Sequence, residues 1–419
     1  MMANVSSSNG QKANVPKLRF PGFEGEWCAS TLSSFFAKVT QKNIDGIITN
    51  VICNSAKQGL IPQREYFDKD IANSENTSGY YIIEQTDFVY NPRKSTDAPY
   101  GPISSYKYAE AGIVSPLYLC FRAKREINPL YFEWYFRSTA WHRYIYMTGD
   151  SGARHDRVSI KDDTFFAMPI NIPSAQEQAR IAAFLNKIDM RIERQRQLVE
   201  ALKKYKRGLL RAYFVDDEWN QHDTWKRCKL GKLCSKIGSG KTPRGGSSVY
   251  VDTGIMFLRS QNVLWGTFEV GDISYINEEI NNTMLSSEVH KGDILLNITG
   301  ASIGRSCIYS LLERANVNQH VCIIRLSQEG GKTILSEFLL QQILSDRVQQ
   351  QIFDCQNGGS REGLNFQQIN NFDIIVPEIS EQNKVCGILS AFDQRIIHGE
   401  NLLRTLCNFR VSLMQQLFI

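Results

Sequence analysis

The sequence predicts an α+β protein in which two globular domains, each with a curved β-sheet and helices, are separated by two long antiparallel coiled-coil helices. The segment 173–192 recurs at 377–396 with seven of its 20 positions identical and no gap. Both copies continue with the heptad pattern of a long helix. The stretch before each copy contains short β-rich runs such as GIMFLRS, GDILLNI and VCIIRL. The chain is therefore an internal repeat with an approximate two-fold axis.

Length and composition limit the class of protein. The 419 residues exceed one ordinary domain, and a hydrophobic content of 42% supplies packed cores. The polar start MMANVSSSNGQKANV lacks a signal-peptide core, and no apolar run approaches the roughly 20 residues that span a bilayer. We therefore expect a cytoplasmic protein that does not bind membranes. Ten cysteines without a C-x-x-C pair predict reduced thiols and no metal site.

The repeat also predicts the domain boundaries. The first globular domain is expected at 16–172 and the second at 215–376, with spacer helices at 173–214 and 377–419. Each helix follows a proline and a serine that is able to cap it, Ser174 or Ser380. If the helices pack on each other, the connectivity makes them antiparallel and puts the two globular domains at opposite ends.

A heptad seam is predicted along both helices, because apolar residues recur every three or four positions. Packing of each helix on the core of its own domain is the alternative. The seam residues are Ile181, Leu185, Ile188, Ile192, Leu202 and Leu209 in the first helix, and Val385, Leu389, Phe392, Ile396, Leu406 and Leu413 in the second.

A long protein with approximate two-fold symmetry suits duplex DNA. The half-sites that such proteins read lie one helical turn, about 34–36 Å, or a multiple of it apart. The net charge of +5 permits such binding without requiring it. Because the two globular domains differ in sequence, they are expected to read two different half-sites. The predicted target is an asymmetric, split sequence with an unread gap.

Polar and basic side chains in the loops are the candidate DNA contacts, because arginine suits guanine, amides suit adenine and lysine suits phosphates. Ordinary solvated turns and exposed charges are the alternative, and His320 is interpreted as structural. The candidates are Arg93, Lys94, Arg154 and Arg157 in the first domain, and Lys241, Thr242, Arg244, Arg259, Gln261, Asn262, Asn297, Thr299, Ser302, Arg305, Asn318, Gln319 and Arg361 in the second.

Four segments carry a family resemblance: PSAQEQARIAAFLNKID, PEISEQNKVCGILSAFD, GDILLNITGASIGRS and GGSREGLNF. With the plan of variable region and repeated helix, the chain resembles the specificity subunit of type I restriction–modification systems from Pro16 to Ile419. The resemblance implies a non-catalytic subunit with two target-recognition domains. It also implies double-stranded DNA, two methyltransferase subunits and restriction subunits as partners. S-adenosylmethionine and ATP with Mg would be used by those partners, with no cofactor on this chain.

Two other classes are considered. An enzyme is disfavoured because KIGSGKTPRGG has Ser235 where a phosphate-binding loop requires glycine. NPRK likewise replaces the second proline and the aromatic residue of the amino-methyltransferase loop Asn-Pro-Pro-aromatic. A coiled-coil adaptor without base readout is the main rival. Its duplex binding would lack the steep salt dependence of a DNA reader.

Overall fold

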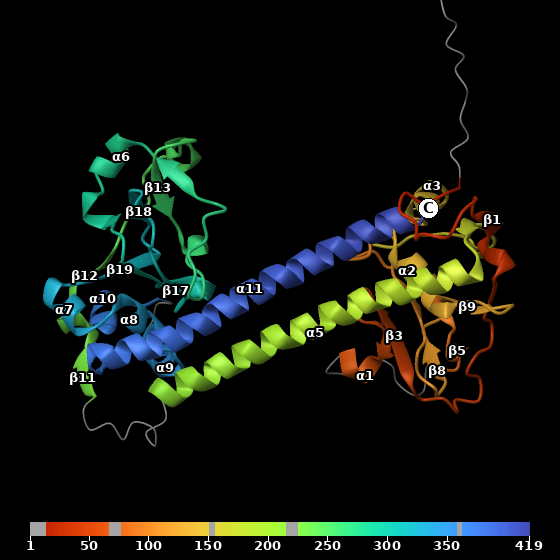
Figure 1. Ribbon diagram of the computed structural model, residues 1–419, viewed down its shortest axis with the longest axis horizontal. Coiled ribbons are helices and arrows are strands. Elements are labelled where there is room, and N and C mark those ends of the chain that lie inside the picture. Colours follow the sequence, from red (N-terminus) through yellow and green to blue (C-terminus); the bar gives the residue numbers. More distant parts are fainter. Residues whose placement is uncertain (1–13, 67–76, 151–155, 215–224, 358–362) are drawn as a thin grey trace, which may run out of the picture. The chain divides into compact units, whose positions relative to one another are not determined.

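The computed structural model describes residues 14–66, 77–150, 156–214, 225–357 and 363–419 (Figure 1). The chain divides into two compact units. Unit 1 comprises 1–195 with 402–419, and unit 2 comprises 196–401. Each unit therefore contains one globular domain together with segments of both long helices.

The globular domain of unit 1 is built from two four-stranded sheets and one two-stranded ribbon. The first sheet has the order β2 (Phe36–Lys38), β9 (Leu119–Ala123), β6 (Phe88–Tyr90), β7 (Ile103–Ser105); the second has the order β4 (Gly59–Pro62), β3 (Val51–Ser55), β8 (Gly112–Val114), β5 (Tyr81–Ile83); β1 (Cys28–Thr31) pairs with β10 (Pro169–Ile172). Strands β3 and β8 are parallel, and the other pairs between these strands are antiparallel.

The globular domain of unit 2 repeats this topology. The first sheet has the order β12 (Cys234–Ser239), β19 (Val321–Leu326), β16 (Ile294–Asn297), β17 (Ser306–Ile308); the second has the order β14 (Ser274–Ile276), β13 (Ile255–Leu258), β18 (Ala315–Val317), β15 (Glu288–Val289); β11 (Lys226–Lys229) pairs with β20 (Asp373–Val376). The parallel pair is again between corresponding strands, β13 and β18. The repeat inferred from the helices therefore extends to the sheets, and the predicted α+β class is confirmed.

Short helices complete both domains, and the two cores differ in composition. They are α1 (Gln63–Tyr66), α2 (Pro129–Arg137), α3 (His142–Thr148) and α4 (Asp162–Phe166) in unit 1, and α6 (Glu278–Asn282), α7 (Gln328–Thr333), α8 (Ser336–Ile343), α9 (Asp346–Asn357) and α10 (Phe366–Asn370) in unit 2. The core of unit 1 is rich in aromatic rings such as Phe36, Phe88 and Phe121. Leucine and isoleucine predominate in the core of unit 2.

The long helices are α5 (Ala175–Phe214) and α11 (Ile379–Leu417). The predicted capping by serine holds for α5, where Ser174 Oγ accepts a hydrogen bond from the Glu177 amide at 3.3 Å. It is wrong for the second helix, because Ser380 lies inside α11. A side-chain amide instead recurs in both helices: Gln178 donates to the Pro173 carbonyl at 3.0 Å, and Gln382 donates to the Pro377 carbonyl at 2.8 Å.

The predicted seam residues are all buried or half-buried. Ile181, Leu185, Ile192, Val385, Leu389 and Leu413 are buried, and Ile188, Leu202, Leu209, Phe392, Ile396 and Leu406 are half-buried. At the helix ends the seam also joins the domain cores: Ile181 and Leu413 pack in the core of unit 1, and Leu389 packs in that of unit 2. Packing of the two helices on each other and packing of each helix on a domain core therefore both hold, each along part of the seam.

Ion pairs show that the two long helices run antiparallel within unit 2. Lys206 Nζ lies 2.6 Å from Asp393 Oδ1, and Lys203 Nζ lies 2.9 Å from Glu400 Oε1, so a step back along α5 matches a step forward along α11. In unit 1, Arg410 pairs with Asp189. The Asp393–Lys206 pair becomes the Asp189–Arg410 pair when each residue is exchanged for its counterpart 204 positions away. The contacts between the helices thus follow the internal repeat.

Candidate nucleic-acid interface

A pocket of about 620 Å³ lies in unit 1 where strands β3, β6 and β8 end, and Asn54, Asn91, Ser115 and Tyr118 contribute to its wall. Burial raises the pKa of the Tyr118 hydroxyl. Loops at strand ends combine fixed positions with variable side chains, which suits recognition. The loops of unit 1 can therefore hold a ligand in this pocket.

Three predicted DNA contacts, Arg93, Lys94 and Arg157, line this pocket. Arg93 and Arg157 face each other in a β-bridge, and the Lys94 amide donates to the Asp156 carbonyl at 2.8 Å. Arg93 Nε lies 3.9 Å from Asp156 Oδ2, and the side chain of Arg93 remains 69% exposed. Backbone pairing thus joins residues that are far apart in sequence into one cationic group. We call Arg93, Lys94 and Arg157 the unit 1 site.

Buried amide hydrogen bonds stabilise the wall of this pocket. Asn54 Nδ2 donates to the Val89 carbonyl at 2.7 Å, and Asn54 Oδ1 accepts from Ser104 Oγ at 2.8 Å. Asn91 Nδ2 donates to the Asn54 carbonyl at 3.1 Å. The ends of β3 and β6 are therefore tied together beneath the cationic group.

Unit 2 has a chain of hydrogen bonds made by hydroxyl, amide and imidazole side chains from three different loops. Thr242, which follows β12, donates to Gln319. Gln319 Nε2 lies 3.1 Å from His320 Nε2, and His320 Nδ1 lies 2.6 Å from Thr299 Oγ1. The hydroxyl and imidazole groups can each donate or accept, so the chain matches the mixed donor and acceptor pattern of base edges. We call Thr242, Thr299, Gln319 and His320 the unit 2 site.

The two sites occupy equivalent places in the repeated fold. In the first sheets, Phe88 pairs with Phe121 in unit 1 and Ile294 pairs with Ile324 in unit 2. The loop after each of these strands receives a matching backbone bond: the Val158 amide donates to the Pro92 carbonyl, and the Leu364 amide donates to the Ile298 carbonyl, both at 2.9 Å. Arg93 follows the first of these strands and Thr299 follows the second.

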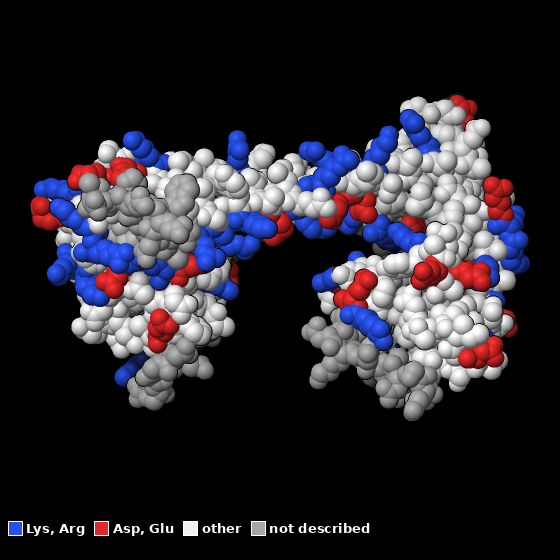
Figure 2. Space-filling model, turned by 90° about the horizontal axis from the view of Figure 1, so that it is seen from below, with Lys and Arg blue, Asp and Glu red and all other residues white. Residues whose placement is uncertain are grey.

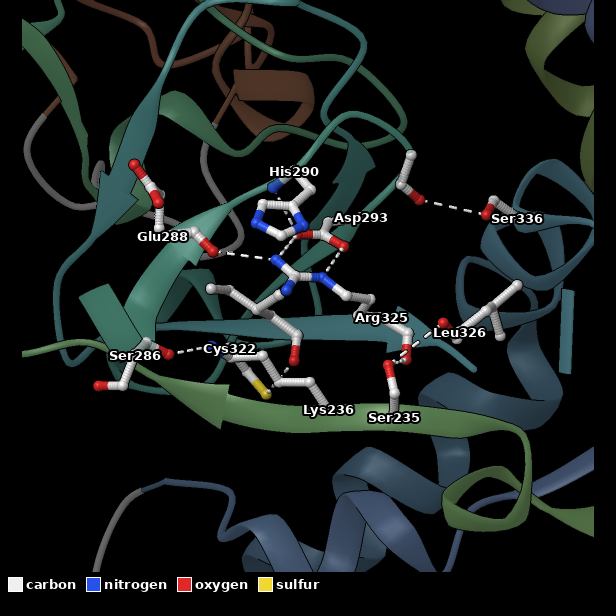
Figure 3. Close-up of polar contacts among 12 residues, drawn as sticks. Ser235, Lys236, Ser286, Glu288, His290, Asp293, Cys322, Arg325, Leu326 and Ser336 are labelled. Atoms are coloured by element: carbon white, nitrogen blue, oxygen red, sulfur yellow. Dashed lines mark hydrogen bonds and ion pairs between the residues drawn. The ribbon is translucent and has the colours of Figure 1, made fainter. Parts of the chain in front are cut away.

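An ion pair with a buried carboxylate precedes the strand that leads to each site, and Figure 3 shows the pair of unit 2. Arg325 Nε and Nη2 donate to the two carboxylate oxygens of Asp293 at 2.8 and 2.7 Å, and the Asp293 side chain is only 2% exposed. In unit 1, Arg122 donates to both oxygens of Asp87 at 2.7 Å, and the Asp87 side chain is 1% exposed. The hydrogen bond to Asp87 raises the pKa of Arg122.

The same carboxylates also close the turn before the strand. Asp293 Oδ2 accepts from the His290 amide at 2.7 Å, and Asp87 Oδ2 accepts from the Glu84 amide at 2.8 Å. Sequence reasoning missed these four residues, Asp87, Arg122, Asp293 and Arg325. The available signal was the aspartate that opens both DFVYN and DILLN.

Three of the predicted DNA contacts, all asparagines, have buried side chains. Asn262 Nδ2 donates to the Asp272 carbonyl at 2.9 Å, and its Oδ1 accepts from the Arg259 amide at 2.9 Å. Asn297 Nδ2 donates to the Ser260 carbonyl at 2.8 Å. Asn318 is 6% exposed, and its Oδ1 accepts from the His320 amide at 3.0 Å. These amides shape the loops instead of facing solvent.

The remaining candidates belong to loops of unit 2 or lie outside the described residues. Arg259 pairs with Asp272 at 3.5 Å, and Gln261 donates to the same carboxylate. Lys241 and Arg244 are exposed, whereas Ser302 and Arg305 are half-buried beside Gly300 and Gly304. Arg154 and Arg361 lie outside the described residues.

The described residues contain no cluster of metal ligands, and several of their thiols are buried. Across the described ranges, no group of three His, Cys, Asp or Glu side chains is arranged to hold a metal ion. All ten cysteines are free, and burial raises the pKa of the Cys307 and Cys322 thiols to about 12. Among the described helices, none combines the length and apolar character needed to cross a membrane.

A family model described as the type I restriction modification DNA specificity domain matches residues 32–204 and 222–404. The MjaVIII specificity subunit of Methanocaldococcus jannaschii is 23% identical over 247 residues, covering 55% of this chain and 57% of that relative. The EcoBI specificity subunit of Escherichia coli is 30% identical over 135 residues, covering 32% of this chain and 28% of that relative. The chain thus aligns with little more than half the length, or less, of these relatives.

Solved structures show the same fold along nearly the whole chain. The S subunit of a type I restriction–modification system from M. genitalium matches with a TM-score of 0.58 at 15% identity, covering 96% of this chain and 99% of that one. A chain from a study of complex assembly in the type I R-M system matches with a TM-score of 0.59 at 17% identity, covering 94% and 97%.

Proposed function

Because the chain belongs to the family of the type I restriction–modification DNA specificity domain, we propose that it is the subunit that recognises specific double-stranded DNA for such a complex. Its matched relatives are specificity subunits, which are the non-catalytic members of these systems. The observation that carries the proposal is the pair of equivalent strand-end sites, one cationic and one neutral, on a repeated framework.

The difference in chemistry supports a bipartite, asymmetric target. Arginine reads the two acceptors on the guanine edge, whereas neutral amide and hydroxyl groups suit edges that present a donor and an acceptor. Arg93 and Arg157 would therefore read or position a half-site different from the one read by Thr299 and Gln319. The two half-sites are separated by an unread gap.

The long helices would dock two copies of a methyltransferase subunit. Tyr205 on α5 and Phe409 on α11 are separated by 204 residues and are 62% and 50% exposed. Large aromatic side chains on a surface are typical anchors of protein interfaces. Because the same type of anchor occurs once in each repeat, two identical partners would each find one. Restriction subunits complete the complex, and S-adenosylmethionine and ATP with Mg are used by the partners.

Selection from a random duplex library tests this function. The full-length chain, alone and with its methyltransferase subunit, is incubated with duplexes of random sequence, and the bound fraction is sequenced. We expect two short, unlike motifs at a constant separation. Enrichment of no motif would overturn the proposal in favour of an adaptor, and a single continuous motif would overturn the bipartite assignment.

A further inference from the structure

Three exposed cations on α5, Lys204, Arg207 and Arg211, form a row that the second repeat does not possess. The steps between them are three and four residues, so they lie on one side of the helix. All three are exposed and lie within unit 2. We call them the α5 basic row.

The internal repeat serves as a reference for this row. The positions 204 residues further along the chain carry Asn408, Val411 and Gln415, all neutral. The other end of α5 shows the same bias, since Lys187 and Arg194 correspond to Ala391 and His398. A surface feature that occurs at the corresponding positions of both repeats suits a partner present in two copies. A feature kept in one repeat suits a ligand present once.

No acidic side chain of the described residues pairs with the α5 basic row. Among residues of the described ranges, no ion pair involves Lys204, Arg207 or Arg211. By contrast, the neighbouring Lys203 and Lys206 point to Glu400 and Asp393 and join the helices. The surface view also shows lysine and arginine side chains on the long helices (Figure 2).

We propose that the α5 basic row binds phosphates of duplex DNA, independently of base sequence. This inference rests on the proposed function. The ligand is polyanionic and regularly spaced, and it is present once per complex, which matches a cationic row on one repeat. Phosphate contacts of this kind add affinity and fix register without specifying sequence. The row thus adds to the two strand-end sites a third contact that does not discriminate between bases.

The test compares two variants with equal loss of charge in the full-length chain. Lys204→Gln/Arg211→Gln removes two cations of the row, and Lys384→Gln/Arg395→Gln removes two exposed cations of α11, also in unit 2. Glutamine keeps a helix propensity close to that of lysine and arginine, so both helices should persist, as checked by circular dichroism. Duplex affinity is measured from 50 to 200 mM salt, on selected and random sequences.

We expect the α5 variant to bind about tenfold more weakly at 0.1 M salt, with the slope of log affinity against log salt reduced by about two, because each phosphate contact contributes about 0.9. The ratio of affinities for selected and random duplexes should stay unchanged, and adding Arg207→Gln should lower the slope further. Equal losses of duplex affinity in both variants, or no loss in the α5 variant, would overturn the proposal that the α5 basic row binds phosphates. Absence of any selective duplex binding by the unaltered chain would instead reject the proposed function.

Discussion

The unit 1 site and the unit 2 site stand at the same strand ends but differ in charge. The cations Arg93, Lys94 and Arg157 meet at the pocket of unit 1, whereas a histidine, a glutamine and two threonines join in unit 2. The frameworks beneath them share strand order and an aspartate–arginine pair in which the carboxylate is buried. The comparison teaches that the fold conserves the position of the loops while leaving their chemistry free to change.

Breaking the framework of one unit should have the largest effect. Asp293→Ala leaves Arg325 without its bidentate partner beneath the unit 2 site. Because Arg325 is 23% exposed, we expect the free energy of unfolding of this domain to fall by about 2–4 kcal/mol. This is at or below the cost of breaking a fully buried ion pair. Hydrogen exchange of the β16 amides should report this loss, with the β6 amides of unit 1 unchanged. The exposed Asp252→Ala is the control, and an equal loss in both variants would contradict the positioning role.

Removing the cations of unit 1 should follow in size. Arg93→Gln and Arg157→Gln should each cost about 1–3 kcal/mol of duplex binding if they contact guanine edges. Library selection should then lose one half-site and keep the other. Arg143→Gln removes an exposed charge of α3 and provides the control. A variant that weakens all sequences equally would identify these arginines as phosphate contacts.

The neutral site should respond more weakly to truncation. Gln319→Ala removes one exposed amide from the hydrogen-bonded chain of unit 2, and we expect a change of about 1 kcal/mol in affinity, because a net hydrogen bond contributes about that much. The loss should be confined to the second half-site of the selected motif. Gln394→Ala, an exposed position on α11, should leave both half-sites as they are. Relaxation of the first half-site instead would refute the assignment of Gln319 to the second.

The smallest effect is expected at the ion pairs between the long helices. Lys206–Asp393 and Asp189–Arg410 are related by the repeat and only partly buried. A double-mutant cycle on each pair should give a coupling energy of about 0.5–1 kcal/mol, since solvent screens such pairs. Urea unfolding of the single and double alanine variants measures both cycles. A coupling energy near zero in one pair alone would show that the repeat is not energetically symmetric.

The sequence predicted the helical parts of the fold better than the loop chemistry. Heptad spacing placed Ile181, Leu185 and Leu389 on the buried side of their helices, because a regular helix turns spacing directly into position. Burial of Asn262 and Asn297 was not predicted, because an asparagine in a loop looks the same whether it faces a base or caps a neighbouring backbone group. For Asn297, the availability of the amide depends on the loop of Ser260 and Val263, which is distant in sequence.

The repeat of 204 residues, by itself, determined the two-copy plan and the heptad seam of the two helices. Only the tertiary structure decided that Arg93 meets Arg157, that Thr242 reaches Gln319, and that Asp87 and Asp293 each pair with an arginine of a neighbouring strand. Helix periodicity can be recognised from residues close together in the sequence, whereas these contacts depend on strand pairing between segments separated by dozens of residues. The physical difference is one of range: helix spacing is a local property, and loop contacts are set by the register of the sheets.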